Sequence, residues 1–495
     1  MPAKSKKEAL HQESVSKAEQ AIASLQKNAD KGPHHLNYHF TAPTSWMNDP
    51  NGLIYFRGEY HMFYQIHPFS PKNGPKHWGH AKSRDLVSWE HLPIALAPSE
   101  DHDRHGCFSG TAVENNGLLT LIYTGNVHRP QKKQVQCIAT SEDGLIFTKH
   151  AGNPVINQFP EDGTIDFRDP KVWKHNGVWY MAIGSGKAGK ANALLYQSSD
   201  LFNWAYIGKM TESNGTQGKV WNCPDFFELD GNDVLLASPA VPHGVKNTRK
   251  SIYMIGTMDY DSGRFTQQSD GDVDHGPDFY APQTWVDHQG RVILIGWMDM
   301  WWNPMPTQAY GWTGAMTLPR LVKMSKSGRL KFEPVPELQT LRKNHRSFPS
   351  QRWTANDSGI FKNIRGDSLE IIIQFDLESC TAEEFGLKVR CSHDGKQETL
   401  ITYKPDLHEV TIDRRKSGTV DGGINVEKLS PRPHHTIQWH LFLDRSSIEL
   451  FVNNGETVIT NRIYPDPSSL GLDLFAKGGA VNVSSLDLWE LRSIW

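Results

Sequence analysis

Residues 85–89 read Asp-Leu-Val-Ser-Trp, and this pairing of an aspartate with an aromatic residue four positions later recurs along the chain. Further instances at regular intervals are Asp143/Phe147, Asp200/Trp204 and Asp261/Phe265. Successive aspartates are 58, 57 and 61 residues apart. A unit of roughly 60 residues that contains only strands and turns fits a four-stranded propeller blade, although the commonest blades have about 40–50 residues. The regular spacing therefore favours a propeller over a chance recurrence.

A second series of polar and proline-containing segments runs upstream of the first. Its members are WMNDPNG (46–52), GCFSGT (106–111), FRDPK (167–171), WNCPDFF (221–227) and DFYAPQT (278–284). Measured between Asp49, Ser109, Asp169, Asn222 and Phe279, the intervals are 60, 60, 53 and 57 residues. The innermost strand of each propeller blade lines the central channel. One polar segment per repeat therefore predicts five blades over residues 36–335, with a site at the channel mouth.

The remaining chain predicts a different kind of β-domain. Seven alternating runs without the repeat are Ser368–Phe375, Phe385–Val389, Thr399–Tyr403, Glu409–Ile412, Thr436–Leu443, Ile448–Val452 and Val481–Leu488. Such runs favour a β-sandwich over residues 346–495, after a linker at 336–345. Residues 1–35 form an N-terminal extension, with a short charged helix expected at 12–28. The predicted fold class is all-β, a five-bladed β-propeller followed by a C-terminal β-sandwich.

Composition excludes several classes of function. The 495-residue chain has 52 Lys and Arg against 55 Asp and Glu, which argues against a nucleic-acid-binding surface. It contains no apolar run of about 18 residues that could span a membrane. The N-terminus lacks the apolar stretch of a secretion signal, and five scattered cysteines fit reduced thiols, so a cytoplasmic location is expected. The sandwich offers edges and faces through which a homodimer could form.

Asp49 and Asp169 are each followed directly by proline. Proline fixes φ and donates no ladder hydrogen bond, so it ends or bulges a strand where the preceding side chain projects. Two carboxylates that face one cavity are the minimum for cleaving a glycosidic bond. The alternative is an ordinary Asp-Pro turn, but the shared phase and the aromatic neighbours, which can stack on sugar C–H faces, favour a site. A phosphate-loop-like stretch at 184–190 lacks the Ser or Thr that would bind Mg²⁺, and we expect no metal or cofactor.

In these segments the chain resembles the β-fructofuranosidases, the glycoside hydrolase family of invertases, sucrose-6-phosphate hydrolases, levanases and inulinases. The resemblance is carried by WMNDPNG (46–52), Phe63-Tyr64-Gln65, His77-Trp78-Gly79-His80, Phe108-Ser109-Gly110, Phe167-Arg168-Asp169-Pro170 and Cys223-Pro224-Asp225. It implies a propeller followed by a sandwich, a small fructoside as substrate, and hydrolysis of sucrose or sucrose 6-phosphate with retained configuration.

The resemblance also implies roles for individual residues. Asp49 matches the nucleophile that forms a covalent fructosyl intermediate, and Asp169 matches the carboxylate that stabilises the transition state. Residues that match the substrate pocket are Trp46, Asn48, Gln65, Trp78, Phe108, Ser109 and Arg168.

One position departs from the family pattern. The family has a glutamate as acid/base before Cys-Pro, whereas this chain has Asn222. An amide has no titratable proton near neutral pH, and general acid–base catalysis is typically worth about 10²- to 10⁴-fold. Turnover is therefore expected to be abolished or strongly impaired, while sugar binding remains. Asp225 is close in sequence but is not expected to take over.

Three alternatives stay open at this point. The chain could be a fructoside-binding protein that has lost catalysis, a related five-bladed glycosidase acting on arabinan or xylan, or a non-catalytic interaction propeller. The sequence does not separate sucrose from sucrose 6-phosphate. A phosphate pocket would need cationic side chains near the channel mouth, and candidates for it are Lys72, Lys76, His77 and Arg104.

Overall fold

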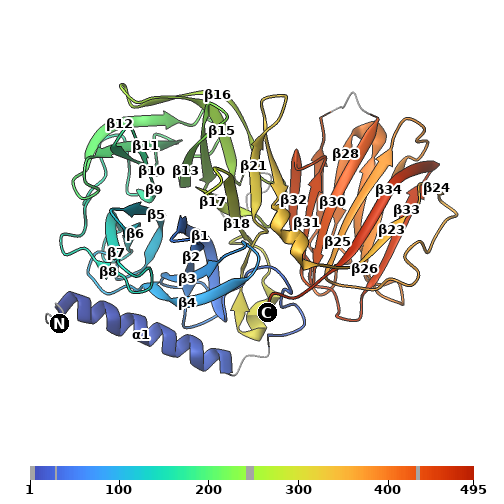
Figure 1. The fold of residues 1–495 in the computed structure, drawn as a ribbon, viewed down its shortest axis with the longest axis horizontal. Coiled ribbons are helices and arrows are strands. Elements are labelled where there is room, and N and C mark those ends of the chain that lie inside the picture. The colour runs from blue at the N-terminus through green and yellow to red at the C-terminus, as the bar shows by residue number, and fades with distance from the viewer. Residues whose placement is uncertain (1–5, 28–30, 241–249, 431–434) are drawn as a thin grey trace.

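The computed structural model describes residues 6–27, 31–240, 250–430 and 435–495. It confirms the all-β fold class, with a propeller on the left and a sandwich on the right of Figure 1, and with helix α1 (Lys6–Lys27) below the propeller. The short 3₁₀ helices are η1 (Pro306–Tyr310), η2 (Pro336–Leu341) and η3 (Pro405–Leu407). Within the described ranges no helix is both long and apolar enough to cross a membrane.

Five sheets form the blades of the propeller. Blade 1 contains β1 (Ser45–Phe56), β2 (Glu59–His67), β3 (His77–Ser83) and β4 (Trp89–Leu96). Blade 2 contains β5 (Cys107–Asn115), β6 (Leu118–Val127), β7 (Lys133–Ser141) and β8 (Thr148–Lys149). Blade 3 contains β9 (Arg168–His175), β10 (Val178–Lys187), β11 (Lys190–Ser198) and β12 (Ala205–Glu212).

The last two blades complete the ring. Blade 4 contains β13 (Trp221–Leu229), β14 (Asn232–Pro239), β15 (Ile252–Asp259) and β16 (Arg264–Asp272). Blade 5 contains β17 (Tyr280–Val286), β18 (Val292–Met298), β21 (Arg320–Met324) and β22 (Leu330–Pro334), and β20 (Ala315–Met316) pairs with β18. The late strand β19 (Trp312–Thr313) pairs in parallel with β1 and so joins the end of the propeller chain to its first blade.

The aspartates of the repeated Asp-aromatic pairs lie in the turns between the third and fourth strands of blades 1 to 4. In blade 1, Asp85 Oδ1 accepts hydrogen bonds from the backbone N–H groups of Val87 and Ser88 at 2.9 and 2.7 Å. Asp143 and Asp200 accept the equivalent pairs of bonds in blades 2 and 3. A carboxylate that satisfies the backbone in this way fixes the turn, which explains why the residue recurs.

The fourth pair lies in the expected turn but plays a different part. In blade 4 it is Asp259 Oδ1 that accepts from the backbone, and one of its donors is the N–H of Asp261 at 3.0 Å. The blade period was therefore predicted correctly, and in blade 4 the residue that fixes the turn is Asp259, two positions before the repeated Asp261.

The innermost strands β1, β5, β9, β13 and β17 contact one another in a ring. Each contains a register shift against its neighbour at the same depth. The unpaired positions are Asn48-Asp49, Ser109, Asp169-Pro170, Cys223-Pro224 and Ala281-Pro282. Asp49, Asp169 and Cys223 each precede the proline of their strand at this depth, so the two aspartates correspond to Cys223. The positions that the sequence interval predicted for the fourth and fifth blades are Asn222 and Phe279. They lie one residue before Cys223 and two residues before Ala281, which are the matching positions in the structure.

Two sheets form the sandwich. The first contains β23 (Arg342–Phe348), β34 (Ala480–Leu491), β25 (Leu369–Asp376), β30 (Thr436–Asp444), β31 (Ser447–Val452) and β32 (Thr457–Arg462), and β24 (Gln351–Thr354) pairs with β34. The second contains β29 (Ile424–Lys428), β28 (Glu409–Asp413), β27 (Thr399–Lys404), β26 (Glu384–Cys391) and β33 (Gly471–Lys477). All seven predicted runs are strands, and β23, β24, β29, β32 and β33 are additional. The mostly exposed β23 begins inside the stretch expected to be a linker.

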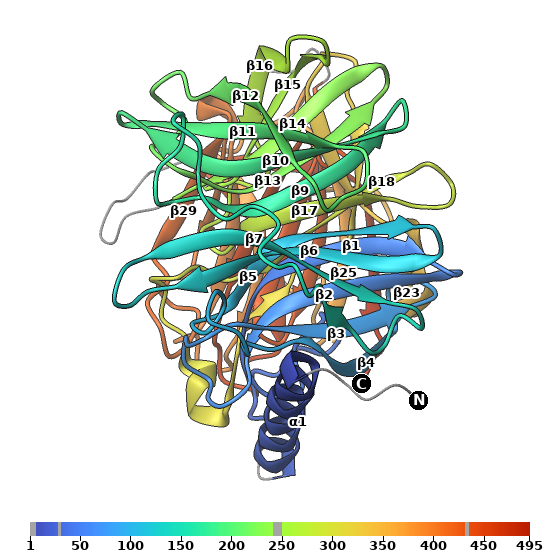
Figure 2. The same cartoon turned by 90° about the vertical axis from the view of Figure 1, so that its left-hand side faces the viewer.

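Helix α1 begins six residues before the predicted start, and it covers the outer strands of the first two blades (Figure 2). Its buried residues are His11, Val15 and Ala18. The His11 ring accepts a hydrogen bond from the backbone N–H of Ala97 at 3.2 Å. The helix therefore satisfies a backbone donor at the outer edge of blade 1.

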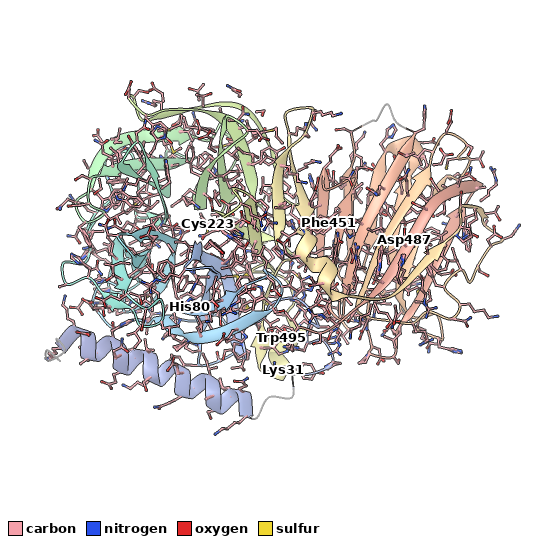
Figure 3. All side chains as sticks on the ribbon, in the orientation of Figure 1. Lys31, His80, Cys223, Phe451, Asp487 and Trp495 are labelled. Atoms are coloured by element: carbon pink, nitrogen blue, oxygen red, sulfur yellow. The ribbon has the colours of Figure 1, made fainter. Side chains whose placement is uncertain are left out.

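The two domains meet at a buried charge network, which we call the domain seam: His39, Asp274, Arg320, Asp444 and Glu449. Arg320 binds Asp274 at 2.9 Å and Glu449 at 2.6 Å. The His39 ring lies 2.8 Å from Asp444 and 3.0 Å from Glu449. Figure 3 places Phe451, which follows this network on β31, at the boundary between the domains. The seam joins blade 5 and the segment before β1 to the sandwich.

Candidate active site

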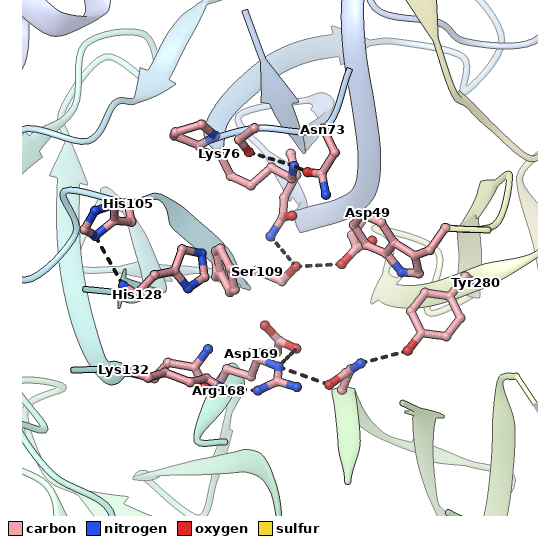
Figure 4. Close-up of a pocket in the computed structure, with 17 residues that line it drawn as sticks. Asp49, Asn73, Lys76, His105, Ser109, His128, Lys132, Arg168, Asp169 and Tyr280 are labelled. Atoms are coloured by element: carbon pink, nitrogen blue, oxygen red, sulfur yellow. Dashed lines mark hydrogen bonds and ion pairs between the residues drawn. The ribbon is translucent and has the colours of Figure 1, made fainter. Parts of the chain in front are cut away.

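A cavity of about 490 Å³ opens at the centre of the propeller (Figure 4). Predicted site residues that line it are Asp49, Gln65, Phe108, Ser109, Arg168, Asp169 and Asn222. Further lining residues are Asn73, Gly74, Pro75, Lys76, His105, His128, Lys132, Gln134, Tyr280 and Trp301. Seven of the ten predicted residues thus line one cavity, six of them on the innermost strands β1, β5, β9 and β13 and Gln65 on β2.

Asp49 lies at the bulge of β1 and is 7% exposed. Its Oδ1 accepts a hydrogen bond from the Asn48 amide at 3.1 Å, and its Oδ2 accepts from the Ser109 hydroxyl at 3.0 Å. The Cys223 thiol lies 3.6 Å from the same Oδ2. Burial raises the pKa of Asp49, although these hydrogen bonds oppose the shift. The carboxylate is held in place by neutral donors, which leaves its charge available for reaction.

Asp169 lies at the equivalent bulge of β9 with its side chain directed into the same cavity (Figure 4). Its backbone has a φ of 64°, in the left-handed region, and its N–H donates to the Thr124 hydroxyl at 2.9 Å. Its Oδ2 accepts from the backbone N–H of Cys223 at 3.0 Å and lies 3.6 Å from that residue's thiol. Burial raises the pKa of Asp169 to about 6, despite the nearby Arg168 guanidinium. The thiol of Cys223 therefore stands between the two carboxylates.

Asn222 precedes the bulge of β13, and both ends of its amide are occupied. Its Oδ1 accepts from Arg168 Nε at 3.1 Å, and its Nδ2 donates to the Tyr280 hydroxyl at 2.8 Å. Burial raises the pKa of Tyr280, so its phenol keeps its proton. Asn222 thus fills this wall of the cavity without contributing an ionisable group.

Asp225 lies three residues further along β13, and its carboxylate is engaged elsewhere. It is fully buried, pairs with Lys171 at 2.8 Å, and accepts the backbone N–H of Thr284 at 2.6 Å. It does not line the cavity. This geometry agrees with the expectation that Asp225 does not replace an acid at position 222.

Three of the predicted pocket residues stand behind the cavity wall. The Trp46 indole donates to Asn48 at 2.7 Å, and Asn48 also donates to Gln65 at 2.7 Å. Trp78 is fully buried and donates to the backbone carbonyl of Phe108 at 3.0 Å. These residues position lining residues, and their contact with substrate stays a prediction.

Most of the polar residues that reach the cavity from loops were not predicted from the sequence. Of the four cations proposed for a phosphate pocket, Lys76 lines the cavity, whereas Lys72, His77 and Arg104 do not. Tyr280 could have been found, because it precedes Ala281-Pro282 as Asn222 precedes Cys223-Pro224. His105, His128 and Lys132 carry no such periodic signal.

No group of three or more His, Cys, Asp or Glu side chains is arranged to hold a metal ion in the part of the chain that the structure describes.

Comparison with known proteins places this architecture in a family. Sequence profiles of the glycosyl hydrolases family 32 match the chain over residues 39–334 for the N-terminal domain and 337–490 for the C-terminal domain. A sucrose-6-phosphate hydrolase from Zymomonas mobilis is 40% identical, over 96% of each chain. A β-fructofuranosidase from Bombyx mori has a TM-score of 0.83 and 34% identity, covering 98% of this chain and 99% of that one.

A mutant of the same Bombyx mori enzyme has been solved in complex with sucrose. It matches with a TM-score of 0.81 and 35% identity, and the match covers 97% of this chain and 98% of that one. These relatives do not favour the arabinan or xylan alternative.

Proposed function

The chain belongs to glycosyl hydrolase family 32, and from that membership we propose that its cavity binds sucrose or sucrose 6-phosphate and forms a fructosyl ester on Asp49. The observation that carries this proposal is the matched placement of Asp49 and Asp169 at equivalent bulges of two innermost strands, facing one cavity. Asp49 would attack C2 of the fructosyl unit, and Asp169 would stabilise the positive charge that develops there.

We also propose that departure of a sugar is slow at this site. A sugar alkoxide leaves readily only when an acid donates a proton to it, and general acid–base catalysis typically contributes about 10²- to 10⁴-fold. Asn222 occupies the acid/base position as an amide, bonded to Arg168 and Tyr280. The neighbouring phenol holds its proton too tightly to serve. The site would therefore bind fructosides well and turn them over poorly.

A fructoside-binding protein is the second candidate. It is favoured by the Asn222 amide, which is hydrogen-bonded at its oxygen and at its nitrogen to residues of the cavity wall. The remaining polar lining, including Gln65 and Ser109, is hydrogen-bonded to Asp49 or its neighbours and is preorganised for a ligand.

The two candidates differ in the response to Asn222→Glu. If the chain is an impaired hydrolase, release of sugar from sucrose or sucrose 6-phosphate should rise by roughly 10²- to 10⁴-fold in this variant. Arg168 Nε already points at position 222 and would hold the new carboxylate. Asn222→Gln is the matched control, because it adds the same length without an ionisable group, and it should stay inactive.

The result that would contradict the hydrolase is an inert Asn222→Glu variant. Such a variant would have to bind sucrose as tightly as the unaltered chain in calorimetry, which would show that its pocket is intact. The binding protein would then be the better description.

A further inference from the structure

Lys76 is a buried cation in the cavity that no step of the proposed hydrolysis uses. It is 3% exposed, and its ammonium group donates to Asn73 Oδ1 and to the carbonyl of Gly74, the latter at 2.9 Å. It lies 5.4 Å from the centre of the Trp46 ring and 5.9 Å from that of Trp301. Both of these hydrogen-bond acceptors are neutral oxygens, one of an amide and one of a backbone carbonyl. Burial lowers the pKa of Lys76 to about 7, so binding of an anion would stabilise its charged form.

A second cationic group lies across the cavity from Lys76 (Figure 4). Lys132 and Arg168 share one carboxylate, that of Asp166, at 2.5 and 2.6 Å. The next carboxylate, Asp169, is 3.9 Å from Arg168 Nε. The hydrogen-bonding partner of that Nε is the neutral Asn222. A carboxylate at position 222 would add a negative charge beside Arg168. With the neutral Asn222 amide there instead, this wall of the cavity is more positive than it would be with a carboxylate.

The amide at position 222 and the cationic side chains of the cavity both favour an oxyanion as the reacting partner. An amide at position 222 removes the proton donor that a sugar leaving group needs, and also the base that water needs. An oxyanion needs neither, because it leaves or attacks without gaining or losing a proton. The same amide also removes the charge that would repel an oxyanion from Arg168.

We propose that this cavity transfers fructosyl groups to and from oxyanions of the phosphate class, which Lys76, Lys132 and Arg168 hold beside Asp49. The proposal rests on the proposed fructosyl ester. In the first step an Asp49 oxygen bonds to C2 of the fructosyl unit, and the leaving group departs with the electron pair of its bond to C2. In the second step a phosphate oxygen bonds to C2, the bond from C2 to Asp49 breaks, and its electron pair returns to the carboxylate. The product is β-fructofuranosyl phosphate.

The experiment uses fructosyl fluoride, whose leaving group needs little protonation, and follows fluoride release while inorganic phosphate is increased at constant ionic strength. We expect steady-state release to rise saturably by about tenfold or more, since two or three charge-assisted hydrogen bonds would hold the acceptor. Fructosyl phosphate should appear in the ³¹P spectrum.

Variants separate the anion site from the nucleophile. Lys76→Met should raise the half-saturating phosphate concentration by roughly tenfold or more, whereas Lys82→Met, which removes a surface lysine paired with Glu59, should not change it. Asn222→Gln should keep the phosphate dependence. Asn222→Glu should lose it, because the added carboxylate repels the anion and activates water instead.

Two outcomes would overturn the proposal, and they are distinguishable from failure of the proposed function. A burst of fluoride followed by slow release that azide accelerates and phosphate does not would support the fructosyl ester but exclude an oxyanion site. Equal phosphate stimulation in the unaltered chain and in Lys76→Met and Lys132→Gln would exclude the assigned cations. Absence of any fluoride burst would instead contradict the ester on Asp49 itself.

Discussion

Asp49 in the cavity and Glu449 in the domain seam are both buried carboxylates, and their surroundings are opposite. Glu449 binds Arg320 at 2.6 Å and the His39 ring at 3.0 Å, and the Arg320 charge, helped by those hydrogen bonds, outweighs burial and lowers its pKa. Asp49 accepts only neutral donors, and burial raises its pKa. Asp444 in the seam and Asp169 in the cavity show the same contrast.

The difference separates the groups that hold the fold together from those proposed to react. A buried charge costs free energy unless a partner charge and hydrogen bonds offset that cost. The seam provides such partners on both domains, so its charges fix how the domains dock. The cavity leaves its carboxylates partly uncompensated, which is a loss of stability that a reactive site commonly carries.

The largest effect is expected from removing Asp49, the proposed nucleophile. Asp49→Asn should lower fluoride release from fructosyl fluoride by roughly 10⁴- to 10⁶-fold, as for other residues that form a covalent intermediate. Its melting temperature should be unchanged or higher, because a neutral amide is less costly to bury. A large loss of stability in this variant would contradict the view that Asp49 is uncompensated in the fold.

In the domain seam, replacing a carboxylate by an amide should instead lower the stability of the fold. Glu449→Gln leaves Arg320 and His39 with one carboxylate each, and breaking a buried pair typically costs about 3–5 kcal/mol of unfolding free energy. Glu13→Gln is the control, since Glu13 pairs with Lys17 at 2.6 Å on the exposed face of α1, where solvent screens the pair, and its loss should change stability far less. Urea unfolding measures both. Equal costs in the two variants would show that the seam adds no more than a surface ion pair.

The fold was predictable because its periodic features have local causes. The aspartates of the blade turns satisfy backbone N–H groups two and three residues ahead, so the repeat is visible in the sequence. The X-Pro bulges of the innermost strands brought Asp49 and Asp169 to one cavity. Strands such as β23, which is mostly exposed and has no alternating pattern, were missed because no core selects its residues. The predicted domain boundaries stay a prediction.

The cavity was predicted less completely, for a different physical reason. Lys132 reaches it from the segment between β6 and β7, and Lys76 from the end of the loop before β3, so neither position follows the blade period. The repeat position predicted in the fourth blade, Asn222, is also one residue before the position that matches Asp49 and Asp169. Cys223 corresponds to Asp49 and Asp169, and its thiol lies 3.6 Å from both carboxylates. The X-Pro pattern in the sequence already contained that correspondence.

The smallest effect is a change in how stability depends on pH. A carboxyl whose folded pKa is raised destabilises the fold increasingly as pH rises from the unfolded pKa to the folded pKa; the penalty is complete above the folded pKa and absent below the unfolded pKa. Burial raises the pKa of Asp169 to about 6. Asp169→Asn should therefore be more stable than the unaltered chain at pH 7, by up to about 3 kcal/mol, and the difference should vanish near pH 4.

Asp444→Asn in the seam should give the opposite sign, which makes the pair of variants a sharper test than either alone. His39 holds the pKa of Asp444 low against the effect of burial, so its stabilisation is present at neutral pH and is lost as pH falls through the folded pKa. The variant should be less stable than the unaltered chain at pH 7, and this deficit should shrink only in acid. Urea unfolding at several pH values between 3 and 8 measures both differences. If Asp169→Asn were also less stable at pH 7, the cavity carboxylates would be structural groups like those of the seam, and the contrast between the two regions would fail.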